Sequence, residues 1–424
     1  MTARLLAGCG GAAVLAVLWG RPRLRSPRAA AIALAAAGGW PIVLMFGPWG
    51  HAGLSPARLS TGLGTLALSR VGAGLLALTA VAGALRHLSR RDAQGPRSAP
   101  IVAVLVAPIA VLALSARGLV PLALLLTLLP LAVAVRWGRV AGPGTLRAGA
   151  VRSGAITGVG LLAGVALAST VGLGRTAPPV VGICLALALA AAVGLVPFTP
   201  WGVLASGLPG ADADLALTWC IPVGVLGSAI LLAGLPGEAA APLQVLLLGL
   251  GLATAVVWAA IAAAGSDPVR AAAVQAADVG LMVAGLSTGR LDGLLGTLLL
   301  LVVTLLVPAA LTARAPAAVR VAGWLAAGGL PPLGAFPARL LILAAVSTVA
   351  FTPTALVTLA MGGLLLAGVR GALRGLRTPP EGGEEASSSA HRLAGVSRWL
   401  VAAAALGAGP LGPLVIPLVY GVHW

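Results

Sequence analysis

The sequence contains no lysine, and all 27 of its basic residues are arginines. A guanidinium stays protonated inside proteins, whereas a buried lysine can lose its proton at physiological pH, so a lysine-based proton relay is excluded. Charged residues make up only 9% of the chain, far below the roughly 25% of soluble domains. The net charge of +17 does not indicate a nucleic-acid partner, because the arginines lie in short connectors between apolar runs.

Cysteine, histidine and the usual enzyme motifs are equally sparse. The three cysteines, Cys9, Cys184 and Cys220, stand singly in apolar segments, so their spacing predicts neither a disulfide framework nor a metal site. The four histidines fall in loops or at the end of the chain. The sequence has no H-E-x-x-H, no G-x-x-x-x-G-K-[ST] and no paired-carboxylate metal motif. We therefore expect no catalytic residue, no metal and no cofactor held by this chain.

Apolar runs of roughly 20 residues dominate what is present, as is typical of membrane-spanning helices. The chain is 59% hydrophobic, with a mean hydropathy of +1.06. We predict an all-α polytopic membrane protein with about fourteen transmembrane helices, the first of them a retained helix and not a signal peptide. The predicted segments are 5–19, 29–49, 62–85, 99–116, 118–137, 152–173, 178–197, 213–234, 242–264, 268–287, 293–313, 318–352, 354–372 and 397–420.

The arginines follow a strong alternation along these segments. The connectors after the odd-numbered segments hold 20 of the 27 arginines, and the other side, with both termini, holds five. The remaining two, Arg70 and Arg339, fall inside segments. Because arginine-rich connectors face the cytoplasm, we expect a multi-pass protein of the cell inner (plasma) membrane with both termini extracytoplasmic.

A weak internal repeat suggests how the chain is organised. Gly194–Trp201 reads GLVPFTPW and Gly329–Phe336 reads GLPPLGAF, in segments five helices apart. Five is odd, so the copies would cross the membrane in opposite directions, as in the inverted repeats of transporters. The expected parts are an N-terminal region 1–98, a first repeat 99–234, a second repeat 242–372, a disordered cytoplasmic loop 373–396 and a last helix 397–424.

The stretch Gly328–Leu343 is apolar enough for a membrane, yet it cannot form one continuous helix. Pro331, Pro332 and Pro337 each remove a backbone donor and clash with the preceding turn. Arg339 adds a charge beside the break. Broken helices in a bilayer need neighbouring helices or a watery cavity to satisfy their backbone groups. A loop between two short helices is the alternative interpretation.

Three stretches resemble the antiporter-like membrane subunits of respiratory complex I (NADH:quinone oxidoreductase) and of Mrp-type cation/proton antiporters. Val196–Gly227 is similar to the V-P-F-H-x-W motif and the helix after it, and Ser266–Gly285 to a D-x-x-R helix start. The Gly328–Leu343 stretch is similar to G-[IL]-P-P-x-x-G-F-x-x-K. The resemblance implies fourteen helices, external termini, two inverted five-helix repeats (helices 4–8 and 9–13) and broken helices 7 and 12. It also implies a place in the lipid bilayer beside other membrane subunits of a larger complex.

The departures from this family concern its proton path. The family's lysines in helices 7 and 8 fall on Ala192 and Pro222, its helix 5 glutamate falls near Leu125, and the histidine after the proline is Thr199. Only the basic site of helix 12 is kept, as Arg339. The resemblance therefore implies an antiporter-like subunit with a degenerate proton path.

Few residues remain as candidates for an ion path. Asp278 and Arg339 both lie at membrane depth in the second repeat, so we propose them as a pair, because intramembrane charges usually pair. In the alternative, Asp278 is neutral and Arg339 satisfies the carbonyls that the prolines free. Pro222 either lines a small polar cavity or kinks a packed helix. The ion-path candidates are Arg339, Asp278, Arg70, Thr199 and Pro222, and the helix-break residues are Gly194, Pro197, Pro331, Pro332 and Pro337.

Three functions are compatible with these observations. The first is a subunit of a proton- or cation-translocating complex, without a catalytic site of its own, which acts as a structural partner or conducts through the second repeat only. A NADH:quinone oxidoreductase-type complex is one such assembly. The second is a stand-alone secondary transporter with inverted repeats. A membrane enzyme acting on lipid-linked substrates is disfavoured, because paired carboxylates are missing.

Overall fold

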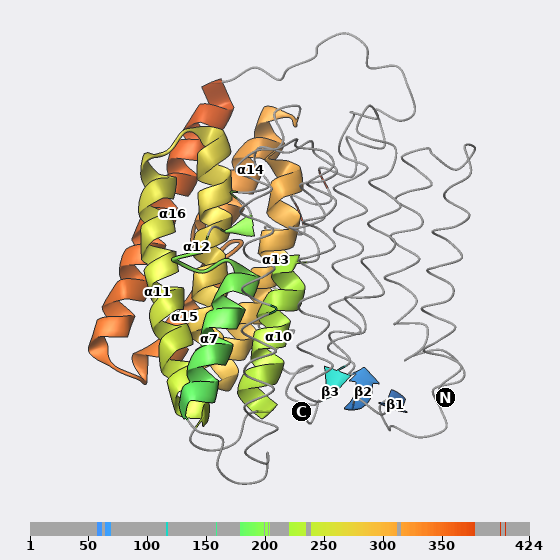
Figure 1. The fold of residues 1–424 in the computed structure, drawn as a ribbon. Coiled ribbons are helices and arrows are strands. Elements are labelled where there is room, and N and C mark those ends of the chain that lie inside the picture. Colours follow the sequence, from blue (N-terminus) through green and yellow to red (C-terminus); the bar gives the residue numbers. More distant parts are fainter. Residues whose placement is uncertain are drawn as a thin grey trace, which may run out of the picture. The chain divides into compact units, whose positions relative to one another are not determined.

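The fold was analysed in a computed structural model (Figure 1). The chain divides into two compact units, Met1–Gly194 with Gly207–Leu243, and Leu195–Ser206 with Gln244–Trp424, and each is described by itself. The structure describes residues 57–61, 64–68, 116–117, 158, 179–198, 200–201, 203, 220–234, 239–311, 315–377, 399 and 403.

The described residues of the first unit include two apolar helices and a small antiparallel sheet. Helices α7 (Pro179–Val193) and α10 (Ile221–Gly234) pack against each other. Strand β1 (Ala57–Thr61) forms a hairpin with β2 (Gly64–Leu68), which also pairs with the short β3 (Ala116–Arg117).

This sheet corrects one sequence-based expectation. We predicted a helix over 62–85, but β2 lies inside this range; β3 overlaps the predicted segment 99–116 only at its last residue, Ala116. An average hydropathy does not separate a strand from a helix, and the short sequence of β2, GTLAL, has no regular polar alternation that would indicate a strand. Every described element from residue 179 onwards is helical, as expected.

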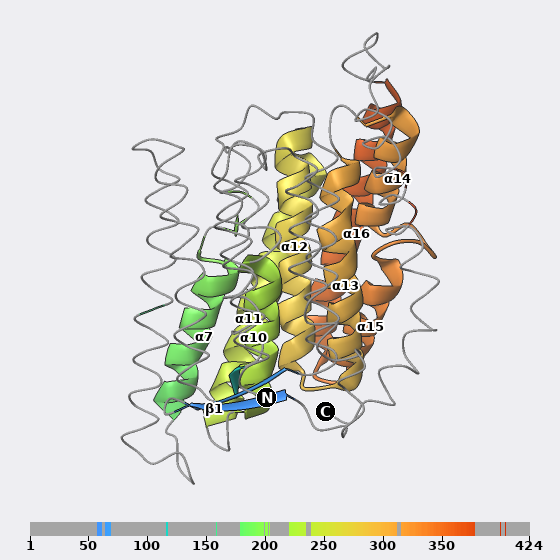
Figure 2. The ribbon, with the colours of Figure 1, turned by 90° about the vertical axis from the view of Figure 1, so that its right-hand side faces the viewer.

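The second unit is a bundle of long and broken helices. Helix α13 packs against α12, α14 and α15, and α16 packs against α12, α14 and α15. Figure 2 shows α14 and α15 following one another along the bundle, with an interruption between them. The bounds are α11 (Ala240–Ala264, beginning in the first unit), α12 (Asp267–Ser287), α13 (Leu291–Ala310), α14 (Ala317–Gly328), α15 (Phe336–Ser347) and α16 (Phe351–Arg377).

Four of the described helices, α11, α12, α13 and α16, are long and apolar enough to cross a membrane. They agree with the predicted segments 242–264, 268–287, 293–313 and 354–372 to within five residues at each end. One boundary is wrong: α16 continues to Arg377, five residues into the range assigned to a disordered loop. Leucines there continue the helical pattern, and Arg374 and Arg377 suit the negative end of a helix dipole.

Glycines allow the helices of the second unit to pack closely. A Cβ atom on Gly280 of α12 would lie 2.6 Å from the carbonyl oxygen of Gly251 on α11. Likewise, a Cβ atom on Gly328 of α14 would lie 2.7 Å from the Cα atom of Gly368 on α16. Small residues at such crossings let backbones approach, which is how apolar helices associate in lipid. Glycine residues therefore contribute directly to the close packing of these helices, including that of α14 against α16.

Candidate functional site: a buried ion pair at a broken helix

The interruption predicted within Gly328–Leu343 is present. Helix α14 ends at Gly328 and α15 begins at Phe336, with Pro337 in its first turn, where proline is tolerated. Gly329 has φ 73°, the left-handed conformation of a helix C-cap. The interruption expected from the prolines is therefore present, between two helices of 12 residues each, and whether the two form one broken membrane span or two short helices joined by a loop stays a prediction.

Two carbonyls of α14 lose their helical partners because of the sequence itself. In a continuous helix, the oxygens of Ala327 and Gly328 would accept hydrogen bonds from the N–H groups four residues later. Those residues are Pro331 and Pro332, which have no N–H group. A buried carbonyl without a partner costs about 1–3 kcal/mol, so other donors are needed here.

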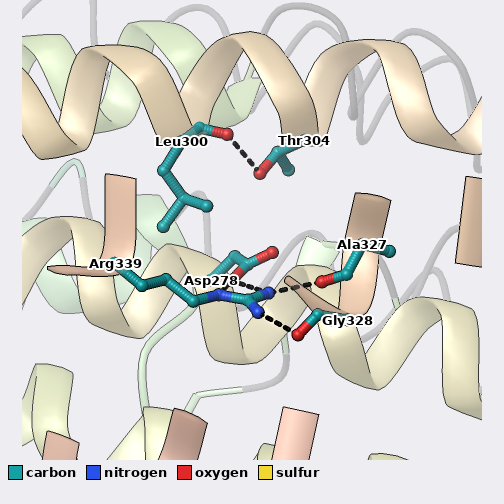
Figure 3. Close-up of polar contacts among 6 residues, drawn as sticks. All are labelled: Asp278, Leu300, Thr304, Ala327, Gly328 and Arg339. Atoms are coloured by element: carbon teal, nitrogen blue, oxygen red, sulfur yellow. Dashed lines mark hydrogen bonds and ion pairs between the residues drawn. The ribbon is translucent and has the colours of Figure 1, made fainter. Parts of the chain in front are cut away.

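Arg339 of α15 supplies these donors (Figure 3). Its NH1 atom donates to the oxygen of Gly328 at 2.7 Å, and its NH2 atom donates to the oxygen of Ala327 at 2.6 Å. The side chain reaches back across the break and occupies the place of the two missing backbone donors. Arg339 is 1% exposed, so this network is closed to bulk water.

The same guanidinium binds Asp278, which projects from α12. Nε and NH2 of Arg339 donate to Oδ1 of Asp278 at 3.0 and 2.8 Å. The Asp278 side chain is only 4% exposed, so the two opposite charges are buried together as a salt bridge. Opposite charges that neutralise each other are the usual way in which a membrane interior accommodates ionisable groups.

The remaining carbonyls in the last turn of α14 are also bonded. The oxygen of Leu325 accepts from the N–H groups of Gly329 and Leu330, at 3.1 Å each. The oxygen of Ala326 accepts from the N–H group of Ala335 at 3.0 Å. Together with the two bonds from Arg339, all four terminal carbonyls of α14 have partners within the chain.

The geometry contains the contact of one interpretation and the carbonyl bonds of the other: Arg339 contacts Asp278 and also satisfies the carbonyls that the prolines free. Four hydrogen bonds engage Nε, NH1 and NH2 of the guanidinium, so four of its five N–H groups are occupied. A guanidinium held in this way is a fixed positive charge and a poor proton carrier. Whether the pair lies on an ion path stays a prediction.

Two further buried polar side chains lie on α12 and on α13, which packs against both α12 and α15. Thr304 of α13 is buried and returns its hydroxyl to the carbonyl of Leu300 at 2.8 Å (Figure 3). Gln275 lies one turn before Asp278 on α12, and its buried Nε2 atom has no hydrogen-bond partner among the described residues. Within the part of the chain that the structure describes, no group of three His, Cys, Asp or Glu residues could hold a metal ion.

The structure describes only one of the other three residues predicted for the ion path. Arg70 and Thr199 lie outside the described residues, so they stay predictions. Pro222 is buried in α10, close to the first of the described residues of that helix. The residues before 220 that would form the other side of a kink lie outside the described part.

The break at Gly194–Trp201 has a local backbone like that at Gly329–Phe336. Both begin with a left-handed glycine, at φ 82° and 73°. The match continues at a constant offset of 135 residues. The N–H group of Gly194 donates to the carbonyl of Ala190, as that of Gly329 does to the carbonyl of Leu325. The N–H group of Phe198 donates to the carbonyl of Leu195, as that of Leu333 does to the carbonyl of Leu330.

A threonine accepts a hydrogen bond from one backbone N–H group of the break at Gly194–Trp201. The N–H group of Val196 donates to Oγ1 of Thr254 on α11 at 2.9 Å, and that hydroxyl donates to the carbonyl of Leu250 at 2.6 Å. Thr254 is fully buried. Sequence reasoning missed this contact, because a single threonine in an apolar run carries no recognisable signal.

Sequence reasoning also missed two buried arginines, which the charge count had assigned to connectors. Arg270 is 1% exposed and donates to the carbonyls of Ala262 and Gly265 at the end of α11, at 3.2 and 2.5 Å. Its guanidinium lies 5.9 Å from the centre of the Trp324 ring. Arg320, also buried, donates to the carbonyl of Gly375 at 3.1 Å. The sequence indicated these contacts only by the position of each arginine, in the first turn of α12 or of α14.

The fold resembles chains of three solved membrane complexes. One is a chain of the Mrp complex from Dietzia sp. DQ12-45-1b, with a TM-score of 0.74 and 19% identity over 96% of this chain. A chain of respiratory complex I from Thermus thermophilus matches with a TM-score of 0.72 and 20% identity, over 96% of this chain and 97% of that one. A chain of the membrane-bound sulfane sulfur reductase, an archaeal respiratory membrane complex, matches with a TM-score of 0.75 and 16% identity, over 98% and 94% of the two chains.

The coverage differs among these matches. The present chain spans about half (52%) of the Mrp-complex chain, but nearly the whole of the other two. No protein-family model and no curated protein matches the sequence. The resemblance inferred from three short stretches is therefore confirmed at the level of the fold: the chain has the fold shared by these chains of the Mrp complex, complex I and the sulfane sulfur reductase.

Proposed function

We propose that the chain is an antiporter-like membrane subunit of a proton- or cation-translocating complex of the complex I or Mrp kind. The likeness in fold to chains of three such membrane assemblies supports this role. Its partners are other membrane subunits in the same bilayer. The proposal includes fourteen helices, external termini and two inverted five-helix repeats, 99–234 and 242–372.

The two breaks support the repeats within this proposal. Their backbone hydrogen bonds correspond at an offset of 135 residues. By the same offset, the position of Arg339 corresponds to Leu204, an apolar residue. The first repeat thus has no counterpart of the one basic group that the second repeat has kept, in agreement with a degenerate first half of the path.

The buried Asp278–Arg339 pair is the observation that carries the proposed mechanism. A residue that relays protons must exchange its proton and change its partners, whereas Arg339 is held by four hydrogen bonds and keeps its charge. We therefore assign Arg339 a structural role: it closes the break in α14–α15 and fixes α12 against it. In this proposal the chain is a non-conducting member of its complex.

Two measurements test the proposal. Purification of the tagged chain from native membranes in mild detergent is expected to recover other membrane subunits in fixed stoichiometry. The isolated chain in proteoliposomes is expected to show no proton or cation flux above protein-free vesicles, and D278N is expected to leave this baseline unchanged. Robust uncoupled exchange by the isolated chain would refute the structural role and favour the second candidate, a stand-alone secondary transporter.

A further inference from the structure

A glutamine of α12 is buried with a donor that no described residue uses. Gln275 is 7% exposed, and its Nε2 atom is fully buried without a hydrogen-bond partner among the described residues. Buried amide groups almost always have a partner, because leaving one unpaired in an apolar interior costs free energy. This atom therefore indicates a place where a small polar molecule binds.

Two contacts fix the register between α12 and α13. Oγ1 of Thr297 on α13 donates to the carbonyl of Met282 on α12 at 3.0 Å. A Cβ atom on Gly293 of α13 would meet the carbonyl oxygen of Gly285 on α12. As the residue numbers rise along α13, those of the contacted residues fall along α12. The two helices are therefore antiparallel neighbours.

The same register brings three polar residues to one level. Gln275 lies seven residues before Met282, and Thr304 lies seven residues after Thr297. Seven residues are nearly two full turns, so each residue keeps the face of the one it is counted from. Asp278 follows Gln275 by three residues, which makes the two side chains neighbours on the surface of α12.

Two acceptors at this level have bonding capacity left. Both hydrogen bonds from Arg339 to Asp278 fall on Oδ1. Figure 3 shows the other oxygen, Oδ2, turned away from the guanidinium. Pro308 lies inside α13 and has no N–H group, so the carbonyl of Thr304 lacks the donor that a regular helix supplies four residues later. One buried donor and two acceptors thus converge between the helices.

We propose that a buried water molecule bridges α12 and α13 at this level. It accepts a hydrogen bond from Nε2 of Gln275 and donates to Oδ2 of Asp278 and to the carbonyl oxygen of Thr304. Three bonds are typical of a buried water. The Asp278 side chain is 4% exposed, so a molecule of this size can still touch it.

The local charges favour water over an ion. Asp278 and Arg339 already neutralise each other, so a cation would add an uncompensated charge to the interior of a membrane protein. An anion would meet a carboxylate oxygen and a carbonyl oxygen. A neutral molecule that both donates and accepts suits all three groups. This inference is independent of whether the chain conducts ions.

A direct hydrogen bond from Gln275 to Asp278 is the competing arrangement. Such a bond would give the amide its acceptor, as pairs of this kind do on helix surfaces. It would leave the carbonyl of Thr304 without a donor, whereas the water serves all three groups. The two arrangements differ in whether density for a separate molecule lies between the side chains.

The first test is a cryo-electron microscopy map of the full-length chain, purified from native membranes with the subunits that accompany it, at a resolution that shows ordered waters. We expect a separate peak within hydrogen-bonding distance of Nε2 of Gln275, Oδ2 of Asp278 and the carbonyl oxygen of Thr304. A map without this peak, or one in which the Gln275 amide contacts Asp278 directly, would overturn the proposal.

The second test measures unfolding of the purified chain by sodium dodecyl sulfate in mixed micelles. Q275M keeps the length of the side chain and removes the amide, and it should raise the unfolding equilibrium constant about fivefold to tenfold, the effect of one hydrogen bond. Q244M, at a half-buried position of α11, is the matched control and should behave like the wild type.

A third variant examines the carbonyl of Thr304. P308A returns an N–H group to α13 four residues after Thr304, so the water loses one acceptor and Q275M should cost less in this background. An unchanged or lowered unfolding constant for Q275M alone would show that the amide was unsatisfied, which contradicts a bound water. An equal effect of Q275M with and without P308A would remove Thr304 from the site and overturn the bridge.

Discussion

Replacing Arg339 with methionine removes four hydrogen bonds and one buried charge in a single step. The Asp278 carboxylate then loses its only described counter-ion, and a buried pair broken in this way costs about 3–5 kcal/mol. The carbonyls of Ala327 and Gly328 lose their donors as well. Hydrogen bonds between helices in membranes average about 0.6 kcal/mol, so the charge should dominate the total.

This reasoning predicts that R339M lowers the free energy of unfolding by at least about 3 kcal/mol. It also predicts that R339M/D278L recovers most of this loss, because the second substitution removes the uncompensated carboxylate. Unfolding of the purified chain by sodium dodecyl sulfate in mixed micelles, followed by tryptophan fluorescence, measures both variants. R290M, at an exposed position, is the matched control and should behave like the wild type.

Two results would refute the reasoning. A loss below about 1 kcal/mol for R339M would mean that the pair does not hold α12 to the break. A double variant as unstable as R339M would mean that the freed carbonyls dominate and the carboxylate does not. A charge-retaining R339K is expected to fall between wild type and R339M, because an ammonium cannot reach Asp278 and both carbonyls in the same fork geometry.

Three further predictions concern packing and backbone satisfaction in the second unit, each measured by the same unfolding assay. G280A should destabilise by about 1–3 kcal/mol, because its Cβ atom would lie 2.6 Å from a carbonyl oxygen of α11, whereas G249A, with open space around it, should not destabilise. T254V should destabilise by about 1–3 kcal/mol, since the N–H group of Val196 loses its acceptor, and T254S should restore stability. R270Q should destabilise by a similar amount, about 1–3 kcal/mol, by freeing two carbonyls at the end of α11, and an unchanged unfolding curve would contradict its capping role.

The interruption could be predicted from the sequence because it follows from local chemistry, and the ion pair could be predicted because lone charges at membrane depth need partners. Pro331 and Pro332 lack N–H groups wherever they are placed, so an interruption was required. A lone arginine and a lone aspartate at membrane depth need partners, and Asp278 and Arg339 lay in the same predicted repeat. The sequence does not specify which carbonyls Arg339 bonds, because this depends on how far the side chain reaches across the break.

The missed features depend on contacts between distant segments. Thr254 accepts from a residue 58 positions away, and nothing in its own run of apolar neighbours marks it. Arg270 was counted as a connector residue because it lies near the start of a segment, although its side chain is buried against α11 and Trp324. Strand β2 was missed because its sequence, GTLAL, lacks the polar alternation that separates a strand from an apolar helix, and β3 is only two residues long.

The 61-residue separation between Asp278 and Arg339 has a consequence for biogenesis. Helix α12 is synthesised and reaches the membrane before Arg339 has been synthesised. Until then, the carboxyl group of Asp278 must lie in a polar environment or be neutral. We expect α12 to settle stably in the bilayer only after α14 and α15 arrive. Chains truncated after residue 311 should therefore insert α12 less completely than chains that extend to residue 350, in a glycosylation-mapping assay. Equal insertion of α12 in both would show that the carboxylate does not need the arginine to enter the membrane.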